Sequence, residues 1–291
     1  MSENTKIISS QVYFLKKDPK YDTVKPYSLR FTPPAGFPRA NVELEAHDIT
    51  IEDVRPVVKE LSLKKNGFSI MPLESSMQYE DFNDKDKVID VYLRELSNTL
   101  RQYLGATRVQ IFEHTIRKRH EIFPISTGEP YQYNQPTSMA HVDTTVPWAV
   151  SMARTLNDGN NDVTTNGHLQ CVNVWKPIIG PVRDWPLAMC DPRTVVPKED
   201  HEPCDLVYPD YVVENLQLYF RPTHRWVYLS DQQVSEAWVF VQSDTENGQV
   251  AGMAFVYDMS CWCIELSPRA SSTYLVPESV GIARRSIERK Y

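Results

Sequence analysis

The segment Cys171-Val-Asn-Val-Trp-Lys-Pro177 begins a series of short β-branched and aromatic runs that decides the fold. Turn residues separate it from three similar runs: Asn215-Leu-Gln-Leu-Tyr-Phe220, Arg225-Trp-Val-Tyr-Leu229 and Glu236-Ala-Trp-Val-Phe-Val241. Side chains of this kind pack well on a pleated surface, so each run predicts a strand. Many short strands without regularly alternating helices favour a mainly β sandwich or double-sheet barrel.

One long helix is expected before this β-rich part. Apolar residues recur at helical spacing from Ile89 to Leu104. Gly105 stands where a glycine commonly ends a helix. We therefore expect a helix over residues 83–105, packed outside one of the sheets.

The rest of the chain is expected to complete a single domain, residues 1–291. Residues 1–82 contain many prolines among aromatic residues, and we expect them to form an extended N-terminal wrap. Residues 107–291 are expected to form the β-rich core. A basic group, Arg117-Lys118-Arg119, is typical of a solvated turn.

Composition narrows the possible partners and the compartment. The formal net charge of −7 disfavours a nucleic-acid partner. No apolar run reaches the roughly 18 residues of a membrane span, and the segment 1–17 lacks the pattern of a signal peptide. The five cysteines are odd in number and fit no zinc spacing, which favours a reduced, cytoplasmic protein.

The motif His141-Val142-Asp143 is the strongest candidate for a catalytic or metal-binding site. On a strand, residues two apart face the same side, so the imidazole of His141 and the carboxylate of Asp143 converge. Two such groups and a distant histidine make the facial triad that holds Fe(II) and leaves positions open for other ligands. Alone, the motif is short enough to be an exposed polar pair that arises by chance.

Five blocks, in order along the chain, resemble one family of enzymes. They are Asn173-Val-Trp-Lys-Pro177, Asp184-Trp-Pro-Leu-Ala188, Cys190-Asp191, Asp205-Leu-Val-Tyr-Pro209 and His224-Arg-Trp-Val-Tyr228. The chain is similar, over residues 109–288, to the asaB-type hydroxylase/desaturase family, which includes fungal gibberellin desaturases and cephamycin methoxylase-like proteins. This resemblance implies a double-stranded β-helix, or jelly roll, of the type found in Fe(II)- and 2-oxoglutarate-dependent oxygenases.

The resemblance also assigns roles to individual residues. His141 and Asp143 match the first two iron ligands of the family. Arg284 and Ser286 lie in an R-x-S-I-E-like motif and would bind the distal carboxylate of 2-oxoglutarate.

Further residues of the matching blocks are candidates for the cavity wall. Asn173, Trp175, Trp226 and Tyr228 are expected to line the pocket for the substrate or for 2-oxoglutarate. For the two tryptophans, burial in an ordinary core is the alternative.

The third iron ligand of the family has no counterpart here. Gly252 occupies the place of the expected histidine, and no histidine follows His224. A glycine offers no side chain to a metal, and His224 or a carboxylate would need rebuilt geometry to replace the ligand. The sequence therefore predicts that no cofactor is required; under the alternative, Fe(II) and 2-oxoglutarate are bound.

Three functions follow from these observations. The first is a natural-product enzyme that performs a redox-neutral cyclisation or isomerisation, such as an intramolecular [4+2] cycloaddition, on a small apolar intermediate. In that case His141 and Asp143 would act as hydrogen-bond or acid–base groups. The alternatives are an Fe(II)/2-oxoglutarate-dependent hydroxylase or desaturase, and a non-catalytic partner subunit of an active oxygenase.

Overall fold

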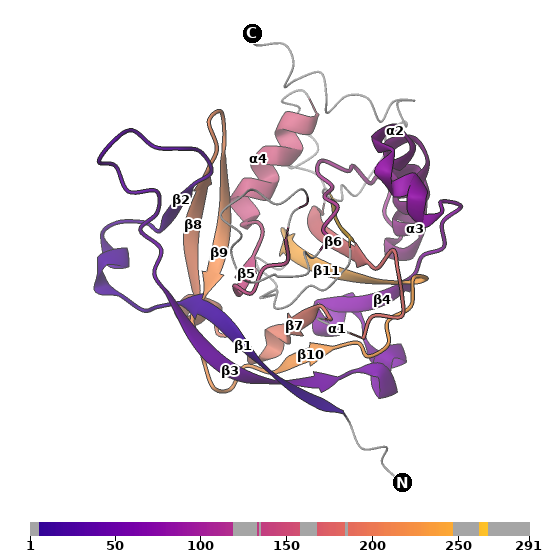
Figure 1. Cartoon of the computed structure of the whole chain (residues 1–291), viewed down its shortest axis with the longest axis horizontal. Helices are drawn as coiled ribbons and strands as arrows, with labels where there is room; N and C mark the ends of the chain where they lie inside the picture. Colours follow the sequence, from indigo (N-terminus) through magenta and orange to yellow (C-terminus); the bar gives the residue numbers. More distant parts are fainter. Residues whose placement is uncertain are drawn as a thin grey trace.

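Three four-stranded sheets form the framework of the described part of the computed structural model (Figure 1). The structure describes residues 6–118, 133, 135–157, 168–183 and 186–246, and the backbone of residues 262–266. The first sheet has the order β1-β3-β10-β7, the second β12-β6-β11-β4 and the third β2-β8-β9-β5. The strands are β1 (Ile7–Leu15), β2 (Tyr27–Leu29), β3 (Leu44–Asp53), β4 (Phe68–Pro72), β5 (His141–Val142), β6 (Gln170–Lys176), β7 (Ala188–Cys190), β8 (His201–Val207), β9 (Val212–Leu218), β10 (Trp226–Tyr228), β11 (Glu236–Asp244) and β12 (Trp262–Leu266).

Helices in the described part are mostly short and lie at the ends and outer sides of the sheets (Figure 1). The α-helices are α1 (Leu63–Asn66), α2 (Lys85–Lys87), α3 (Leu93–Leu104), α4 (Val146–Leu156) and α6 (Pro197–Asp200). A π-helical turn, η4 (Val88–Tyr92), joins α2 to α3, and 3-10 turns occur at η1 (Pro19–Asp22), η2 (Arg55–Glu60), η3 (Tyr79–Asn83) and η5 (Pro192–Thr194).

The first sheet connects the other two. A bridge between Leu15 and Tyr219 joins it to the third sheet. Side chains of β7 and β10 pack against those of β4, β6 and β11 of the second sheet in one buried cluster. The second and third sheets therefore stand on opposite sides of the molecule (Figure 1). This arrangement confirms the predicted mainly β jelly roll with flanking helices.

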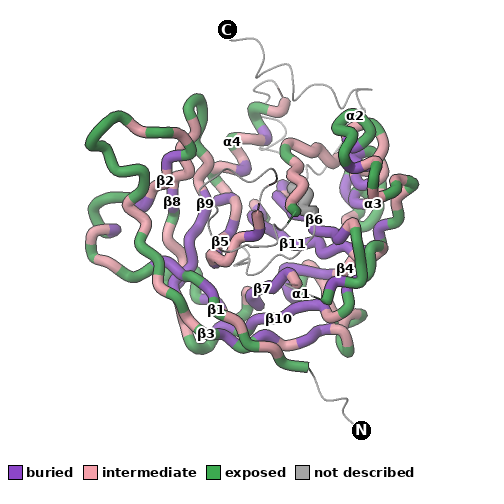
Figure 2. Tube along the Cα trace, viewed as in Figure 1, coloured by how far each residue is buried: buried purple, intermediate pink, exposed green. Residues whose placement is uncertain are grey.

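All four runs that predicted strands form strands, namely β6, β9, β10 and β11. Their residues are among the most buried of the molecule (Figure 2). On β6, Val172 and Val174 face the helix α3 in one cluster, whereas Trp175 belongs to a second cluster on the opposite face. This alternation is what a strand buried on both faces requires.

The helical segment follows the apolar spacing of the sequence. Residues 85–104 are helical, and Gly105 has the left-handed φ of 60° that suits a terminal glycine. Leu93, Leu96 and Leu100 are buried against the second sheet. The helix therefore covers the outer face of that sheet.

The N-terminal region differs from the expected wrap. Residues 6–82 contribute four strands, and β1 pairs with β3 in antiparallel register over its whole length, from Ile7↔Glu52 to Leu15↔Leu44. The prolines that suggested an extended wrap lie mainly between these strands, where a missing N–H breaks no ladder hydrogen bond.

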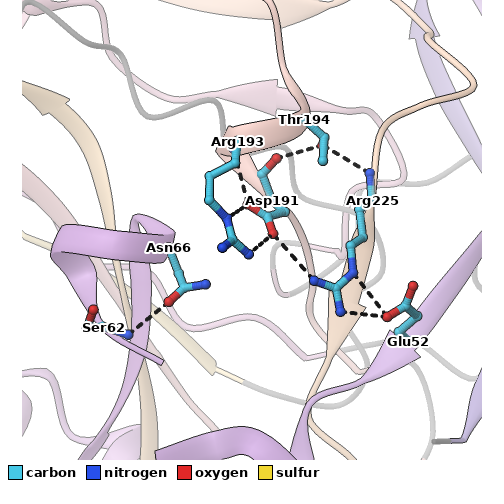
Figure 3. Close-up of polar contacts among 7 residues, drawn as sticks. All are labelled: Glu52, Ser62, Asn66, Asp191, Arg193, Thr194 and Arg225. Carbon is cyan, nitrogen blue, oxygen red and sulfur yellow. Dashed lines mark hydrogen bonds and ion pairs between the residues drawn. The ribbon is translucent and has the colours of Figure 1, made fainter. Parts of the chain in front are cut away.

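Asp191 stands at the centre of a polar network that ties the strand ends of the first sheet together (Figure 3). Its carboxylate accepts hydrogen bonds from Arg193 Nε at 2.8 Å and from the Arg193 backbone N–H at 3.1 Å. Arg225 lies 3.6 Å from the same carboxylate and donates to Glu52 of β3 at 2.7 Å. Although burial is the largest influence and raises the pKa of the Asp191 carboxyl, these arginines bring it below its usual value.

A second buried network surrounds Asp200. The carboxylate accepts hydrogen bonds from Arg221 Nε at 2.8 Å and from the Val196 backbone N–H at 2.7 Å, and it lies 3.1 Å from His224 Nε2. The neighbouring His201 has its pKa lowered to about 4, mainly because burial disfavours the imidazolium.

His201 makes stability depend on pH. Between pH 6.5 and 4 the unfolded chain binds a proton at this residue and the folded protein does not, so the free energy of unfolding falls as the pH is lowered. Across this pH range, protonation at His201 lowers the free energy of unfolding by about 3 kcal/mol in total. We expect His201→Gln to flatten this dependence, measured as urea denaturation midpoints at several pH values. An unchanged slope would contradict the assignment.

In the part of the chain that the structure describes, no helix has the length and apolar character needed to cross a membrane.

Candidate active site

The motif His141-Val142-Asp143 lies at the inner end of the third sheet. His141 and Val142 form β5, which pairs with β9 through His141↔Gln217 and Val142↔Leu216. A pocket of about 370 Å³ opens beside it. Its walls come from β5, β6, the hairpin between β8 and β9, α4 and the irregular segment 112–117.

The histidine and the aspartate face each other in this pocket. His141 Nε2 lies 3.2 Å from Asp143 Oδ1. The other ring nitrogen, Nδ1, lies 2.7 Å from the carbonyl oxygen of Met139. A carbonyl only accepts, so Nδ1 carries a proton and donates it. Nε2 faces the carboxylate: a protonated ring donates a hydrogen bond to it, and a neutral ring presents a lone pair that requires a cation in between.

The Asp143 carboxylate is held on its other side as well. Asn173 Nδ2 donates to Asp143 Oδ2 at 2.6 Å. Burial is the largest influence on the pKa of the Asp143 carboxyl and raises it, but His141, Asn173 and the positive charge of Arg117 together bring the pKa below its usual value. The group is therefore ionised at neutral pH.

The two groups fit a metal ion. A lone pair on Nε2 and an ionised carboxylate oxygen repel each other unless a cation or an added proton lies between them. Two atoms that bind one ion at about 2.1 Å and at a right angle are separated by roughly 3.0 Å, close to the 3.2 Å found here. A bond from Nδ1–H to a backbone carbonyl is one of the usual ways in which proteins orient a metal-binding histidine.

A third ligand is not found among the described residues. They contain no group of three histidine, cysteine, aspartate or glutamate side chains placed to hold a metal. His224 is not displaced towards the pocket, since it contacts Asp200, and His168 lies 2.6 Å from Asp244. Gly252, Arg284 and Ser286 lie outside the described residues.

The predicted pocket residues separate into two sets. Asn173 lines the pocket together with His141 and Asp143. Trp175, Trp226 and Tyr228 do not line it, which corrects the prediction of a cavity wall. Trp175 is buried in the cluster between the first and second sheets, and Trp226 and Tyr228 are buried in a cluster formed mainly by the first sheet.

Several pocket residues were missed from the sequence. Glu113, Thr115 and Arg117 line the pocket at alternate positions of one extended segment. Arg117 therefore does not belong to a purely solvated turn. These residues alternate along a strand-like segment, so the sequence could predict that their side chains share one face. It could not predict that this face borders a cavity.

Glu113 brings a second acid into the pocket. Loss of water around this residue is the largest influence and raises the pKa of its carboxyl, and the nearby Asp143 carboxylate raises it further. Arg117 acts in the opposite direction. The two acids thus differ, because Asp143 stays ionised while Glu113 retains its proton to higher pH and can donate a hydrogen bond.

Apolar and aromatic side chains also line the pocket. Phe112 packs on Trp148 with ring centroids 5.8 Å apart, and Trp148 Nε1 donates to the Val212 carbonyl at 3.0 Å. Leu206 and Tyr208 line the pocket from the β8–β9 hairpin. The pocket lining therefore combines apolar and aromatic side chains with charged and hydrogen-bonding groups.

Comparison with known proteins gives consistent matches. A family model described as an oxidoreductase/YMDC permease-like domain matches residues 12–260. An oxidoreductase of Emericella nidulans is 29% identical over 225 residues, covering 71% of this chain and 75% of that protein. The Fe(II)/2-oxoglutarate-dependent dioxygenase nvfI of Aspergillus novofumigatus is 27% identical over 241 residues, covering 81% and 84%.

A solved structure shares the fold. The iron and alpha-ketoglutarate-dependent endoperoxidase NvfI superimposes with a TM-score of 0.75 at 24% identity, covering 91% of this chain and 97% of that one. These matches confirm the resemblance to fungal oxygenases of this kind. They also overturn the prediction that no cofactor is expected, because such relatives are named for their dependence on iron and 2-oxoglutarate.

Proposed function

The chain belongs to the oxidoreductase/YMDC permease-like domain family, and from this premise we propose that it is an Fe(II)- and 2-oxoglutarate-dependent oxygenase. Its substrate would be a small, largely apolar natural-product intermediate that it hydroxylates or desaturates. The observation that carries the proposal is the 3.2 Å approach of His141 Nε2 to Asp143 Oδ1.

In this proposal His141 and Asp143 hold the iron. Met139 fixes the tautomer of His141, and Asn173 fixes the rotation of the Asp143 carboxylate, so both ligand atoms are oriented before the metal arrives. When bound, iron with 2-oxoglutarate and oxygen supplies the oxidation of a C–H bond. Arg284 and Ser286 are proposed to bind the distal carboxylate of 2-oxoglutarate, on the resemblance alone.

The mixed lining of the pocket supports the substrate class. The apolar body of the substrate would lie on Phe112, Trp148 and Tyr208, which removes apolar surface from water. A hydroxyl or carbonyl group on the substrate would meet Glu113 or Arg117. Few, well-placed polar contacts of this kind fix the orientation of a ligand and select the bond that reacts.

The test needs no identified substrate. Purified protein mixed with Fe(II) and 2-oxoglutarate without oxygen is expected to develop a visible charge-transfer absorption, and admission of oxygen is expected to yield succinate. His141→Ala should lose both signals, because it removes one proposed ligand. His47→Gln is the matched control, since His47 does not line the pocket and stacks on Phe220.

Two results would count against the proposal. If wild type gave neither the absorption nor succinate, the iron-dependent activity would be excluded. Conversion of an identified substrate that continued in the presence of a chelator would instead support the redox-neutral cyclisation predicted from the sequence.

A further inference from the structure

A β-bulge in β11 lies directly behind the candidate active site. Val241 pairs with Val172 of β6, but Ser243 pairs with the next residue, Cys171, so Gln242 is an extra residue on β11. In a regular strand, neighbouring side chains point to opposite faces. The bulge instead lets both Gln242 and Ser243 reach towards β5.

The contacts show where these two side chains end. The backbone N–H of Asp143 donates to Gln242 Oε1 at 2.7 Å. One residue further along each segment, Thr144 Oγ1 lies 3.4 Å from Ser243 Oγ. Bulge residues therefore contact two consecutive residues just after β5, and the shorter contact is to Asp143 itself.

Gln242 makes this contact at an energetic cost. Its side chain is fully buried, and its Nε2 has no hydrogen-bond partner among the residues that the structure describes. A buried donor without a partner destabilises the folded state, because it has lost its hydrogen bonds to water. The hydrogen bond that the structure gives this buried side chain is directed at the backbone of Asp143.

We propose that Gln242 is a positioning residue that sets the backbone of Asp143 so that its carboxylate meets His141 Nε2. The inference rests on the proposed function, because its purpose is the alignment of two metal ligands. The three contacts to Asp143 then have separate tasks: Gln242 fixes the backbone, Asn173 fixes the carboxylate rotation, and His141 is the second ligand.

Three variants separate this role from a general loss of packing. Gln242→Met keeps the length of the side chain but removes the acceptor. Gln242→Glu keeps an acceptor oxygen for the Asp143 N–H. Gln232→Met is the matched control, because Gln232 is also buried and its side-chain hydrogen bond goes to a different backbone group, the Glu236 carbonyl at 2.8 Å, and not to Asp143.

The first measurement is amide hydrogen exchange of the metal-free protein, read on a peptide that contains residues 141–144. The loss of one hydrogen bond of about 1.4 kcal/mol corresponds to roughly 10-fold faster exchange at the Asp143 amide. We expect this change in Gln242→Met, wild-type protection in Gln242→Glu, and wild-type protection of this peptide in Gln232→Met.

The second measurement is titration with Co(II) alone, followed by its visible absorption. Residues that orient metal ligands typically contribute 10- to 100-fold to affinity. We expect Gln242→Met to bind Co(II) about 10- to 100-fold more weakly than wild type, and Gln232→Met to bind it with wild-type affinity.

The outcomes distinguish this inference from the proposed function. Wild-type exchange in Gln242→Met would overturn the inference, and so would faster exchange with unchanged Co(II) affinity. If wild-type protein bound no Co(II), the proposed function would fall, while the exchange of the Asp143 amide would still decide whether Gln242 holds that backbone.

Discussion

Asp143→Ala is expected to weaken Fe(II) binding by more than about 100-fold and to remove succinate formation. The substitution deletes the carboxylate that faces His141 Nε2, and loss of a direct ligand exceeds the roughly 10- to 100-fold effect of groups that only orient ligands. Metal content after dialysis and succinate yield measure the two effects.

The controls for Asp143→Ala separate metal binding from packing. Asp143→Asn keeps the size of the side chain and an oxygen for Asn173 Nδ2, so it should fold like wild type while still binding iron poorly. Asp53→Asn alters another buried aspartate, which accepts backbone hydrogen bonds from Arg55 and Ser230 away from the pocket. Asp53→Asn should keep wild-type metal affinity, and wild-type affinity in Asp143→Ala would contradict the assignment.

Asp200→Ala is expected to lower the free energy of unfolding by about 3–5 kcal/mol. Its carboxylate is 1% exposed and is the partner of Arg221 and of the fully buried His224 side chain. Removing one member of a buried ion pair leaves the other charge or donor without compensation. Urea denaturation at neutral pH measures the change.

Glu199→Ala is the matched control for Asp200→Ala. Glu199 pairs with the same Arg221 at 2.7 Å, but its side chain is 63% exposed. Exposed ion pairs contribute about 0–1 kcal/mol, so this variant should unfold close to wild type. Equal effects of the two substitutions would show that burial does not set the strength of the Asp200 network.

The strands and the helix could be predicted because their signals are local. β6 and β11 are short runs of β-branched and aromatic residues, and the helix to Leu104 repeats its apolar residues every three or four positions. The pairing of β1 with β3 was not predicted. That pairing depends on residues about 40 positions apart, which no local pattern reports.

The site was predicted only in part for a similar reason. His141 and Asp143 are two residues apart on extended chain, so their convergence follows from strand geometry. Trp175 and Trp226 have large aromatic side chains, which are common both in cavity walls and in protein cores. In this structure they lie in the core. Aromatic character predicts burial, and whether the buried neighbour is a ligand or another strand depends on how the sheets pack.

The sequence alone therefore determined the mainly β architecture, the jelly-roll resemblance and the His141–Asp143 pair. Only the tertiary structure decided what surrounds that pair. Gln242 reaches Asp143 across 99 positions of the chain, through a bulge that exists only because β11 pairs with β6. Glu113 and Arg117 line the same pocket as His141 and Asp143, although they lie more than 20 positions away in the chain. Contacts of this kind form only when segments distant in the chain fold against each other. A local sequence pattern therefore cannot predict them.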